Sequence, residues 1–566
     1  QMPIESACAS ALEDHLNAEV VAGTVASVDE AIEWMTYTYL YTRMRRNPMC
    51  YGISWDTIRA DPMLVVARRE LIESAARKLD DCRMLRYDAR SGLLACTDLG
   101  RVASHYYVCH ETIAVWNKML RAHLSDSELL HVVCCAQEFE QLKLRDEEAA
   151  ELMILERDYC PVTIFRPAAK SQGRYGTEDG MTAEEIRSIG AGGGGAIALG
   201  TRVRGGGKAQ GRRHGDGGVG ALASGLKGMS GSAAQVIAAL DKASAVDALS
   251  KANVMLQSYI SGARPSTPTL ISDSYYVGKN GARISRALFE ISMYRGWGST
   301  ALACLELCKA IDHQLWWATS DAVSRHGGRK GKSRVRWHPL RQFSQLRNTP
   351  SVLENLEQKR VTIARLRDMD AHEVGALVHH VRAGNTVLAA ANNFPVLRLS
   401  ATLHPITRGI LRMKVSVEPD FIWKKGVHGD RLSYWVWVED SDSERIYHSE
   451  RLNIRRGDDD GGAQDLEFVI PVEEPLPSQF HIYAANDRWV SATTIATVSL
   501  RHLMLPKAGT ALTPLLDLRP LAVASVLPPA FAPLFAVKFS HFNPIQTQMF
   551  HTAYHSDQSM LLGAPT

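Results

Sequence analysis

The spacing of apolar residues changes at Pro395, and this change restricts the fold of the chain more than any other feature. Before Pro395, apolar residues recur at every third or fourth position, which is the pattern of helices that bury one face. After it, apolar residues alternate with polar ones, which is the pattern of half-buried strands. The chain should therefore be a multidomain α+β protein, with helices first and strands later. The clearest alternating residues are Leu411, Met413, Val415 and Val417.

Residues 1–110 predict a winged helix. Ser27 and Glu30 form a capping box, the pattern that satisfies exposed backbone N–H groups where a helix begins. Two short apolar runs within 84–96 flank a glycine-containing turn and predict a hairpin, after which Thr97 can cap a further helix. Such a domain can bind nucleic acid or serve only as a packing spacer, and the sequence leaves both readings open. A long helix over 64–82 should face the core with Leu64, Ala67, Leu71, Ala75 and Leu79.

Residues 111–338 predict a helical domain that carries two insertions. The first insertion, about 163–248, is rich in glycine and arginine, and it cannot bury enough apolar surface to offset the entropy of ordering. We therefore expect its glycine-rich part to be disordered. The second, about 319–337, is a basic loop with six Lys and Arg residues between 325 and 336 and no acid among them. Both can be plain solvated loops, or they can contact phosphates without specificity.

Residues 339–392 predict a helix–loop–helix, and residues 393–527 predict a β-sandwich of the immunoglobulin or fibronectin type. In the second range, short alternating runs are separated by clusters of Gly, Asp and Pro, as in antiparallel sandwiches. Because no cysteine lies between 393 and 527, the disulfide of antibody domains is excluded.

The ten cysteines form no C-x-x-C pair and no zinc-ribbon spacing with histidine, so we expect no metal site. Free cysteines suit a reducing compartment, and we expect a cytoplasmic and nuclear location. The net charge of +3 is small for 566 residues, so any surface that binds nucleic acid must be local. No run of about 18 apolar residues occurs, which gives no reason to expect a membrane partner.

The end of the chain predicts part of a phosphate-binding loop. Leu561 and Leu562 suggest a buried strand that leads into Gly563, Ala564, Pro565 and Thr566. A complete loop of this kind also needs a Gly-Lys-Thr or Gly-Lys-Ser segment, because a lysine must reach the phosphates. That segment is not in the sequence. We therefore expect no ATP hydrolysis by this segment alone, since nothing would stabilise the charge of the transition state.

The helix predicted over 280–297 is the best candidate for a functional surface. Its apolar residues Ile284, Leu288 and Ile291 are spaced by four and three positions, so they should share a buried face. Such a helix can be an ordinary surface helix of a helical domain, and this reading stays open.

The other faces of this helix suggest contact with a single strand of nucleic acid. Arg283, Ala287 and Tyr294 can lie on one side. The arginine would meet a phosphate, the alanine would allow close approach, and the tyrosine ring would stack on a base. We therefore expect these residues to guide a sliding single strand.

Several segments resemble the tandem-cassette superfamily 2 DExH helicases. In that family each cassette contains two RecA-like domains, a winged helix, a helical ratchet domain, a helix–loop–helix and a fibronectin-like sandwich. The last three form a unit shared with a protein-translocation factor of the endoplasmic reticulum. The segments that carry the resemblance include Tyr37-Thr38-Tyr39-Leu40-Tyr41, Leu99-Gly100-Arg101, Ala282-Arg283, Arg286-Ala287-Leu288-Phe289-Glu290-Ile291, Pro339-Leu340-Arg341-Gln342-Phe343 and Phe542-Asn543-Pro544-Ile545-Gln546-Thr547-Gln548.

Between subfamilies, the chain is more similar to the helicase subunit of the activating signal cointegrator complex. The runner-up is the spliceosomal helicase that unwinds a pair of small nuclear RNAs. The segments that favour the first are Arg45-Arg46-Asn47-Pro48, Leu270-Ile271-Ser272-Asp273-Ser274 and Phe539-Ser540-His541-Phe542.

The resemblance implies roles for particular residues. Asn280, Arg283 and Tyr294 fall on the ratchet helix that contacts the translocating strand. Gln546 falls on the glutamine that reads adenine, and 563–566 fall on the opening of the phosphate loop. Residues 528–566 would then begin a second RecA-like domain that the sequence cuts short, and ATP and Mg²⁺ would bind the complete protein rather than this segment.

The resemblance also implies a function. The chain would be the strand-guiding and scaffolding segment of an ATP-dependent 3′–5′ helicase whose subfamily acts in DNA alkylation repair and in splitting collided ribosomes. Its partners would be single-stranded RNA or DNA, the other subunits of a cointegrator or ribosome-rescue complex, and the ribosome. The alternatives are the spliceosomal helicase and a non-catalytic protein-interaction adaptor.

Overall fold

A computed structural model describes residues 4–164, 248–326, 335–441, 445–456, 464–473, 475–501, 503–506, 519–557 and 559–562. Most of the predicted first insertion and part of the basic loop lie outside these residues, as do residues 563–566. The chain divides into two compact units. The first comprises residues 1–400, 416–465 and 479–498, and the second comprises residues 401–415, 466–478 and 499–566.

The first unit begins with the predicted winged helix. The hairpin is present: β1 (Leu85–Asp88) pairs antiparallel with β2 (Leu93–Cys96). The hydroxyl of Thr97 then accepts a hydrogen bond from the Gly100 N–H at 3.1 Å and caps α6 (Asp98–Tyr106), as predicted. The other helices are α1 (Leu12–Ala22), α2 (Val28–Thr36), α3 (Tyr39–Arg46), α4 (Trp55–Ala60) and α5 (Val65–Asp81), with 3₁₀ turns η1 (Cys8–Ala11) and η2 (Pro48–Tyr51).

The predicted core face of α5 is confirmed at Ala75 and Leu79, and at Leu64 just before the helix, but it is wrong at Leu71. Leu71 is 37 % exposed, whereas Arg68 is only 5 % exposed. The Arg68 guanidinium can be buried because it donates to the carbonyl oxygen of Ile32 at 2.9 Å and lies over the Tyr41 ring. Backbone carbonyls and an aromatic face replace water as partners of the charge, which removes most of the penalty for burying it.

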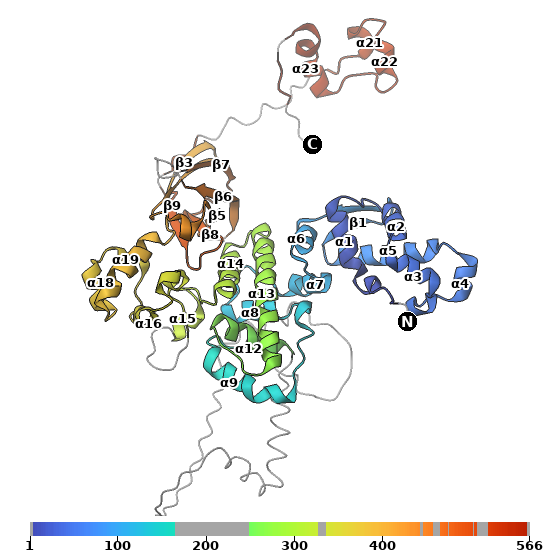
Figure 1. Cartoon of the computed structure of the whole chain (residues 1–566). Helices are drawn as coiled ribbons and strands as arrows, with labels where there is room; N and C mark the ends of the chain where they lie inside the picture. Colours follow the sequence, from blue (N-terminus) through green and yellow to red (C-terminus); the bar gives the residue numbers. More distant parts are fainter. Residues whose placement is uncertain are drawn as a thin grey trace, which may run out of the picture. The chain divides into compact units, whose positions relative to one another are not determined.

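A helical bundle follows, and α13 (Pro268–Tyr294) is its longest helix at 27 residues. Pro268 stands at its first position, where a missing N–H removes no internal hydrogen bond. Figure 1 shows α13 beside α14, and both helices contact α12. The bundle consists of α7 (His110–Met119), α8 (Asp126–Cys134), α9 (Ala149–Tyr159), α12 (Ala248–Ile260), α13, α14 (Gly298–His313) and α15 (Asp321–His326), with η3 (Gln137–Phe139) and η4 (Asp146–Glu148).

The predicted helix–loop–helix region has a core of its own, which includes Leu340, Leu356, Val374, Val387 and Ala390, all fully buried. Its elements are η5 (Pro339–Gln342), η6 (Ser344–Leu346), α16 (Pro350–Gln358), α17 (Ile363–Arg367), α18 (Ala371–Leu377), η7 (Val381–Ala383) and α19 (Gly384–Asn393).

In the described residues after Pro395 there are seven strands, as the change of period predicts. They form one sheet in the order β3-β4-β7 and another in the order β6-β5-β8-β9. Leu411, Met413, Val415 and Val417 are all fully buried, so the predicted alternation is confirmed. The strands are β3 (Leu397–Thr407), β4 (Ile410–Pro419), β5 (Arg431–Asp440), β6 (Ile446–Arg455), β7 (Gln464–Pro471), β8 (Gln479–Asn486) and β9 (Thr493–Ser499), with the short helix α20 (Lys425–His428) before β5.

The second unit ends in three short helices, α21 (Val523–Val526), α22 (Ala532–Ala536) and α23 (Pro544–His555). Within the described ranges, no helix has the length and apolar character needed to cross a membrane.

Candidate nucleic-acid interface

The helix α13 buries the face that its sequence predicts. Ile284 and Leu288 are fully buried, and Ile291 is 2 % exposed. The spacing of four and three residues therefore decides which face of α13 packs into the core. The polar side chains lie on the remaining faces, toward neighbouring elements or solvent.

Asn280 and Arg283 lie together on α13, as predicted, and Arg283 also holds the winged helix. The Arg283 Nη1 donates to the carbonyl oxygens of Tyr106 and Tyr107 at 2.5 Å each, and its Nη2 donates to Asn280 Oδ1 at 2.7 Å. Those carbonyls end α6, where Tyr107 has a left-handed backbone with φ 52°. A cation at a helix C-terminus interacts favourably with the helix dipole and with unpaired carbonyls. Arg283 therefore fixes α6 against α13.

Ala287 cannot contact a strand, and that prediction is wrong. Its side chain is fully buried, because α6 packs along this part of α13. The Tyr106 hydroxyl donates to Glu290 Oε1 at 2.6 Å, one turn further along α13. The contact between α6 and α13, called the seam below, therefore runs from Arg283 to Glu290. Burial, followed by the hydrogen bond to Glu290, raises the pKa of Tyr106 well above its usual value, so the hydroxyl stays a donor. Arg283 and Tyr294 consequently lie at opposite ends of a covered seam.

Tyr294 stands in an open groove at the C-terminal end of α13. Its side chain is 59 % exposed, and the groove has a volume of about 890 Å³. Three cations, Arg83, Lys118 and Arg295, line the groove. Two carboxylates, Asp81 and Asp98, also line it, and Asp98 pairs with Arg101 at 2.8 Å, so the cations outnumber the acids. The groove therefore places an aromatic ring among basic groups, which suits base stacking combined with phosphate contact.

Two of these cations repel each other. Burial and the charge of Arg83 both lower the pKa of Arg295. Arg295 is nevertheless held in place, because its Nη2 donates to Asn117 Oδ1 at 2.5 Å and its guanidinium lies 5.1 Å from the centre of the Trp297 ring. An anion placed between Arg83 and Arg295 would relieve this repulsion, and a phosphate has the right charge.

A second aromatic and cationic pair lies near the start of α13, and sequence reasoning missed it. Tyr275 is 64 % exposed, and Lys279 is exposed with its Nζ 5.6 Å from the centre of the Tyr275 ring. The two residues are four positions apart, so they are neighbours on one face of the helix. That spacing was available in the sequence and could have indicated the pair.

Gln546, the predicted adenine-reading residue, takes part in the start of α23. Asn543 and Gln546 form a capping box, in which Gln546 Oε1 accepts from the Asn543 N–H at 3.0 Å. Its side-chain Nε2 has no partner among the described residues and remains able to donate. The phosphate-loop residues Gly563, Ala564, Pro565 and Thr566 lie outside the described part, and no group of acids, His or Cys within that part could hold a metal ion. Of the predicted nucleotide-binding residues, Gln546 alone lies in the described part, where it caps a helix.

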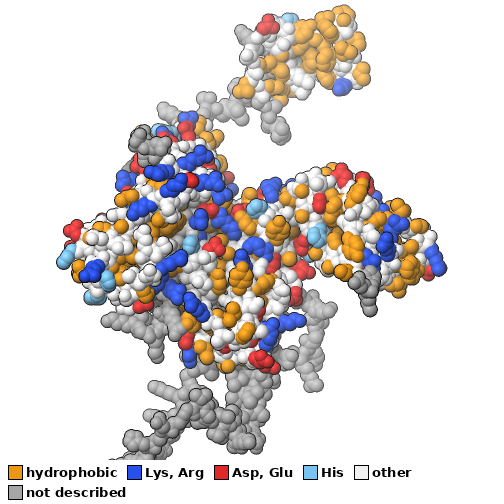
Figure 2. Space-filling model, viewed as in Figure 1, with side chains coloured by type: hydrophobic (Ala, Val, Ile, Leu, Met, Phe, Trp, Pro, Cys, Tyr) orange, Lys and Arg blue, Asp and Glu red, His pale blue; other side chains and the backbone are white. Residues whose placement is uncertain are grey.

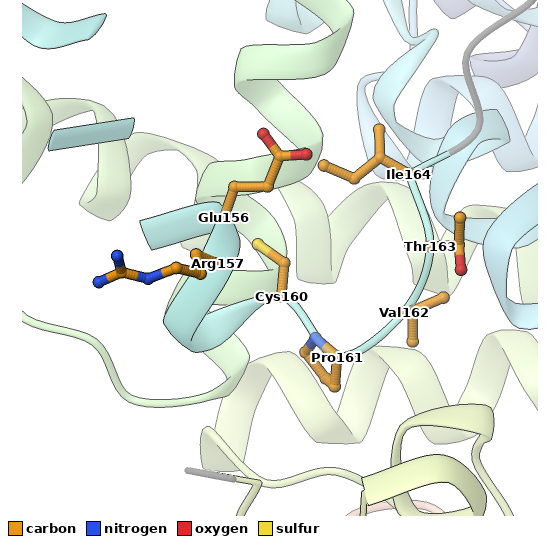
Figure 3. A pocket seen from close by; sticks show the side chains of 7 residues that line it. All are labelled: Glu156, Arg157, Cys160, Pro161, Val162, Thr163 and Ile164. Atoms are coloured by element: carbon orange, nitrogen blue, oxygen red, sulfur yellow. The ribbon is translucent and has the colours of Figure 1, made fainter. Parts of the chain in front are cut away.

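A further pocket of about 450 Å³ lies at the end of α9 (Figure 3). The guanidinium of Arg157 points away from the other lining side chains. Burial raises the pKa of the Cys160 thiol to about 12, so this thiol is not a nucleophile at neutral pH. The pocket presents no converging polar groups and carries no functional assignment.

Two protein families match parts of the chain. The Sec63 Brl domain family matches residues 96–177 and 230–499, and a winged helix-turn-helix domain family matches residues 5–81. These two matches agree with the winged helix and with the helical and β parts of the fold.

Curated relatives match the whole chain. They include activating signal cointegrator 1 complex subunit 3 from Gallus gallus at 39 % identity and the DExH-box ATP-dependent RNA helicase DExH14 from Arabidopsis thaliana at 37 %. The U5 small nuclear ribonucleoprotein 200 kDa helicase from Drosophila melanogaster is 35 % identical. The match covers 100 % of this chain in each case, but only 21 %, 22 % and 22 % of the respective relatives. The chain thus spans about a fifth of the length of these relatives.

Proposed function

Because the chain belongs to the Sec63 Brl domain family, we propose that it is the strand-guiding and scaffolding part of an ATP-dependent 3′–5′ nucleic-acid helicase. The relatives named as helicases, among them the Arabidopsis RNA helicase, support this proposal. The observation that carries it is the groove in which exposed Tyr294 stands beside Arg83, Lys118 and Arg295.

Arg283 is proposed to act at the other end of the seam. A guanidinium has five N–H groups, and three of those on Arg283 are used by Tyr106, Tyr107 and Asn280. Two N–H groups have no partner among the described residues, so they can donate to a phosphate oxygen without releasing α6. Arg283 is thus both a positioning residue for the winged helix and a proposed strand contact, with Asn280 holding its side chain.

The proposal includes the wider assembly. The complete helicase would bind ATP and Mg²⁺, with Gln546 reading adenine. The partners would be single-stranded RNA or DNA, the subunits of a cointegrator or ribosome-rescue complex and the ribosome, in the cytoplasm and nucleus. A spliceosomal role is the second candidate, favoured by the 35 % identity to the U5 relative.

The test is binding of a fluorescent single-stranded oligonucleotide at several salt concentrations. Tyr294→Ala is expected to weaken binding about 5- to 150-fold, because loss of base stacking costs about 1–3 kcal/mol. Arg283→Ala should weaken binding and reduce its salt dependence, whereas Arg283→Lys should retain most of the affinity.

Arg77→Ala is the matched control, because Arg77 is 60 % exposed on α5 and, among the described residues, pairs only with Glu73 in its own helix. A deletion of residues 190–228 removes the glycine- and arginine-rich segment as a competing site. If wild type and an Arg283→Ala/Tyr294→Ala double variant bind equally in that deleted background, the adaptor reading is favoured over strand guiding.

A further inference from the structure

A second basic cavity lies on the sheet that contains β5, β6 and β8. It has a volume of about 630 Å³, and four arginines line it: Arg431, Arg451, Arg455 and Arg488. Figure 2 shows Lys and Arg side chains gathered over these strands and continuing toward α13 and α14. With a net charge of only +3 for the whole chain, such a concentration of like charge is a local feature.

The strand register forces two of these arginines together. Arg431 and Arg455 are directly opposite each other in the antiparallel β5–β6 pair. Directly opposed side chains have Cβ atoms about 4.5–5.5 Å apart and project to the same face, and like charges in this position destabilise the sheet. Leu432 and Ile454, the next opposed pair along the two strands, are buried on the other face, so both arginines point outward. An anion held by both guanidinium groups would offset the repulsion.

The acids near the cavity are already paired. Asp487 accepts hydrogen bonds from Arg286, from Arg451 at 3.1 Å and from the indole N–H of Trp435 at 3.0 Å. Asp430 pairs with Lys425 at 3.1 Å. In the part of the chain that the structure describes, Arg431, Arg455 and Arg488 have no carboxylate within 4.0 Å. Three forked donors without a counter-ion are therefore available, and a guanidinium fork matches a phosphate group.

The position of the cavity suggests which phosphates it receives. Asp487 joins Arg286 of α13 to Arg451 of the cavity, so the cavity borders the proposed strand-binding helix directly. We propose that Arg431, Arg455 and Arg488 hold the phosphodiester backbone of the same single strand after it passes α13. This inference rests on the proposed function and adds a second contact surface on the β sheet. The arginines supply affinity without reading sequence, because phosphate contacts do not distinguish bases.

The experiment measures binding of single-stranded RNA of increasing length to the full chain, with an Arg431→Gln/Arg455→Gln variant. For long oligonucleotides, the variant should bind about fivefold more weakly or worse, and the slope of log Kd against log salt should fall by about 1.4 for two lost phosphate contacts. Short oligonucleotides that reach only α13 should bind as in wild type. Tyr294→Ala should weaken both lengths, so that failure of this inference differs from failure of the proposed function.

An Arg398→Gln/Arg412→Gln variant is the matched control, because these strand arginines pair with Asp420 and Glu467 at 3.4 and 3.5 Å. Equal binding of long RNA by wild type and by Arg431→Gln/Arg455→Gln would overturn the inference. The same follows if tripolyphosphate binds through these arginines while RNA binding does not depend on them, since the cavity then takes a small anion. A second variant replaces Asp458, Asp459 and Asp460, which lie outside the described residues, by Asn. If RNA binding depends on Arg431 and Arg455 only in this aspartate-free variant, the inference is also contradicted.

Discussion

Lys251→Met should destabilise the helical bundle by about 3–5 kcal/mol, the largest effect that we expect from a single substitution. The Lys251 side chain is fully buried in α12, and its Nζ donates to Glu148 at 2.6 Å, to Asp273 at 2.7 Å and to the Lys143 carbonyl at 2.9 Å. All three N–H groups of the ammonium are therefore satisfied. Removing the charge would leave two carboxylates close together and would leave the buried Glu148 without its main cation.

This destabilisation can be measured by urea denaturation and by amide hydrogen exchange in α9, α12 and α13. Lys279→Met is the control, because Lys279 is exposed on α13 and should contribute less than about 1 kcal/mol. A Lys251→Met/Glu148→Gln double variant should recover part of the lost stability, since the uncompensated buried charge is then removed. Equal stability of wild type and Lys251→Met would show that the network does not hold the bundle together.

The same network predicts how stability depends on pH. Burial alone would raise the pKa of Glu148, but hydrogen bonds from Lys251, Thr269 and Arg145 outweigh it and lower the pKa from 4.5 to about 2. The folded state therefore binds this proton less tightly than the unfolded state does. The stabilisation is complete above pH 4.5 and is lost as the pH falls toward about 2. The difference in unfolding free energy between wild type and Lys251→Met should shrink over this range.

Gly100→Ala should destabilise the winged helix by about 3 kcal/mol, the second largest expected effect. A Cβ atom at this position would lie 2.0 Å from the Met84 carbonyl oxygen and 2.7 Å from Asn17 Oδ1. The backbone of Met84 leads into β1, and Asn17 donates to the Gly100 carbonyl at 3.0 Å. The methyl group therefore cannot be accommodated by rotation of a flexible side chain, and α6 must move. Because Arg283 holds the end of α6, binding of a single strand should weaken as well.

Thermal unfolding and hydrogen exchange in α1 and α6 would measure this effect. Gly426→Ala is a suitable control, because a Cβ there would meet nothing within 4 Å. That substitution should change stability by less than about 0.5 kcal/mol. If α6 exchanged its amides at the same rate in Gly100→Ala and wild type, the close approach of α6 to β1 would not be a constraint on this fold.

The elements of the fold follow from local sequence signals where those signals act within one element. Ser27 caps α2 by accepting from the Glu30 N–H, as predicted, but the Glu30 side chain accepts from the Ala26 N–H, so the predicted capping box is not completed. The cap and the period of two after Pro395 depend only on residues close together in the sequence. The apolar face of α13 follows for the same reason, because Ile284 and Leu288 need only a helix and a core.

The contacts between elements could not be predicted in this way. Ala287 has the size and spacing of an exposed strand contact, but it is covered by α6, about 180 residues earlier in the chain. Arg68 is buried because carbonyl and aromatic partners from α2 and α3 receive it. The Arg431–Arg455 pair depends on strand register, which the hydrophobic pattern limits without identifying the partner of each residue. Tertiary partners thus decide which polar residues of a helix or strand remain available for function.

Photo-crosslinking with a single-stranded RNA that contains 4-thiouridine tests the central claim most directly. The account predicts that Tyr294 and its groove neighbours Arg83, Lys118 and Arg295 carry the adducts, with further adducts near Asn280 and Arg283. Peptide mapping by mass spectrometry would locate them in the full chain. Adducts confined to residues 165–247 and 327–334, with none on α13 or its groove, would contradict the assignment of α13 as the helix that guides the strand.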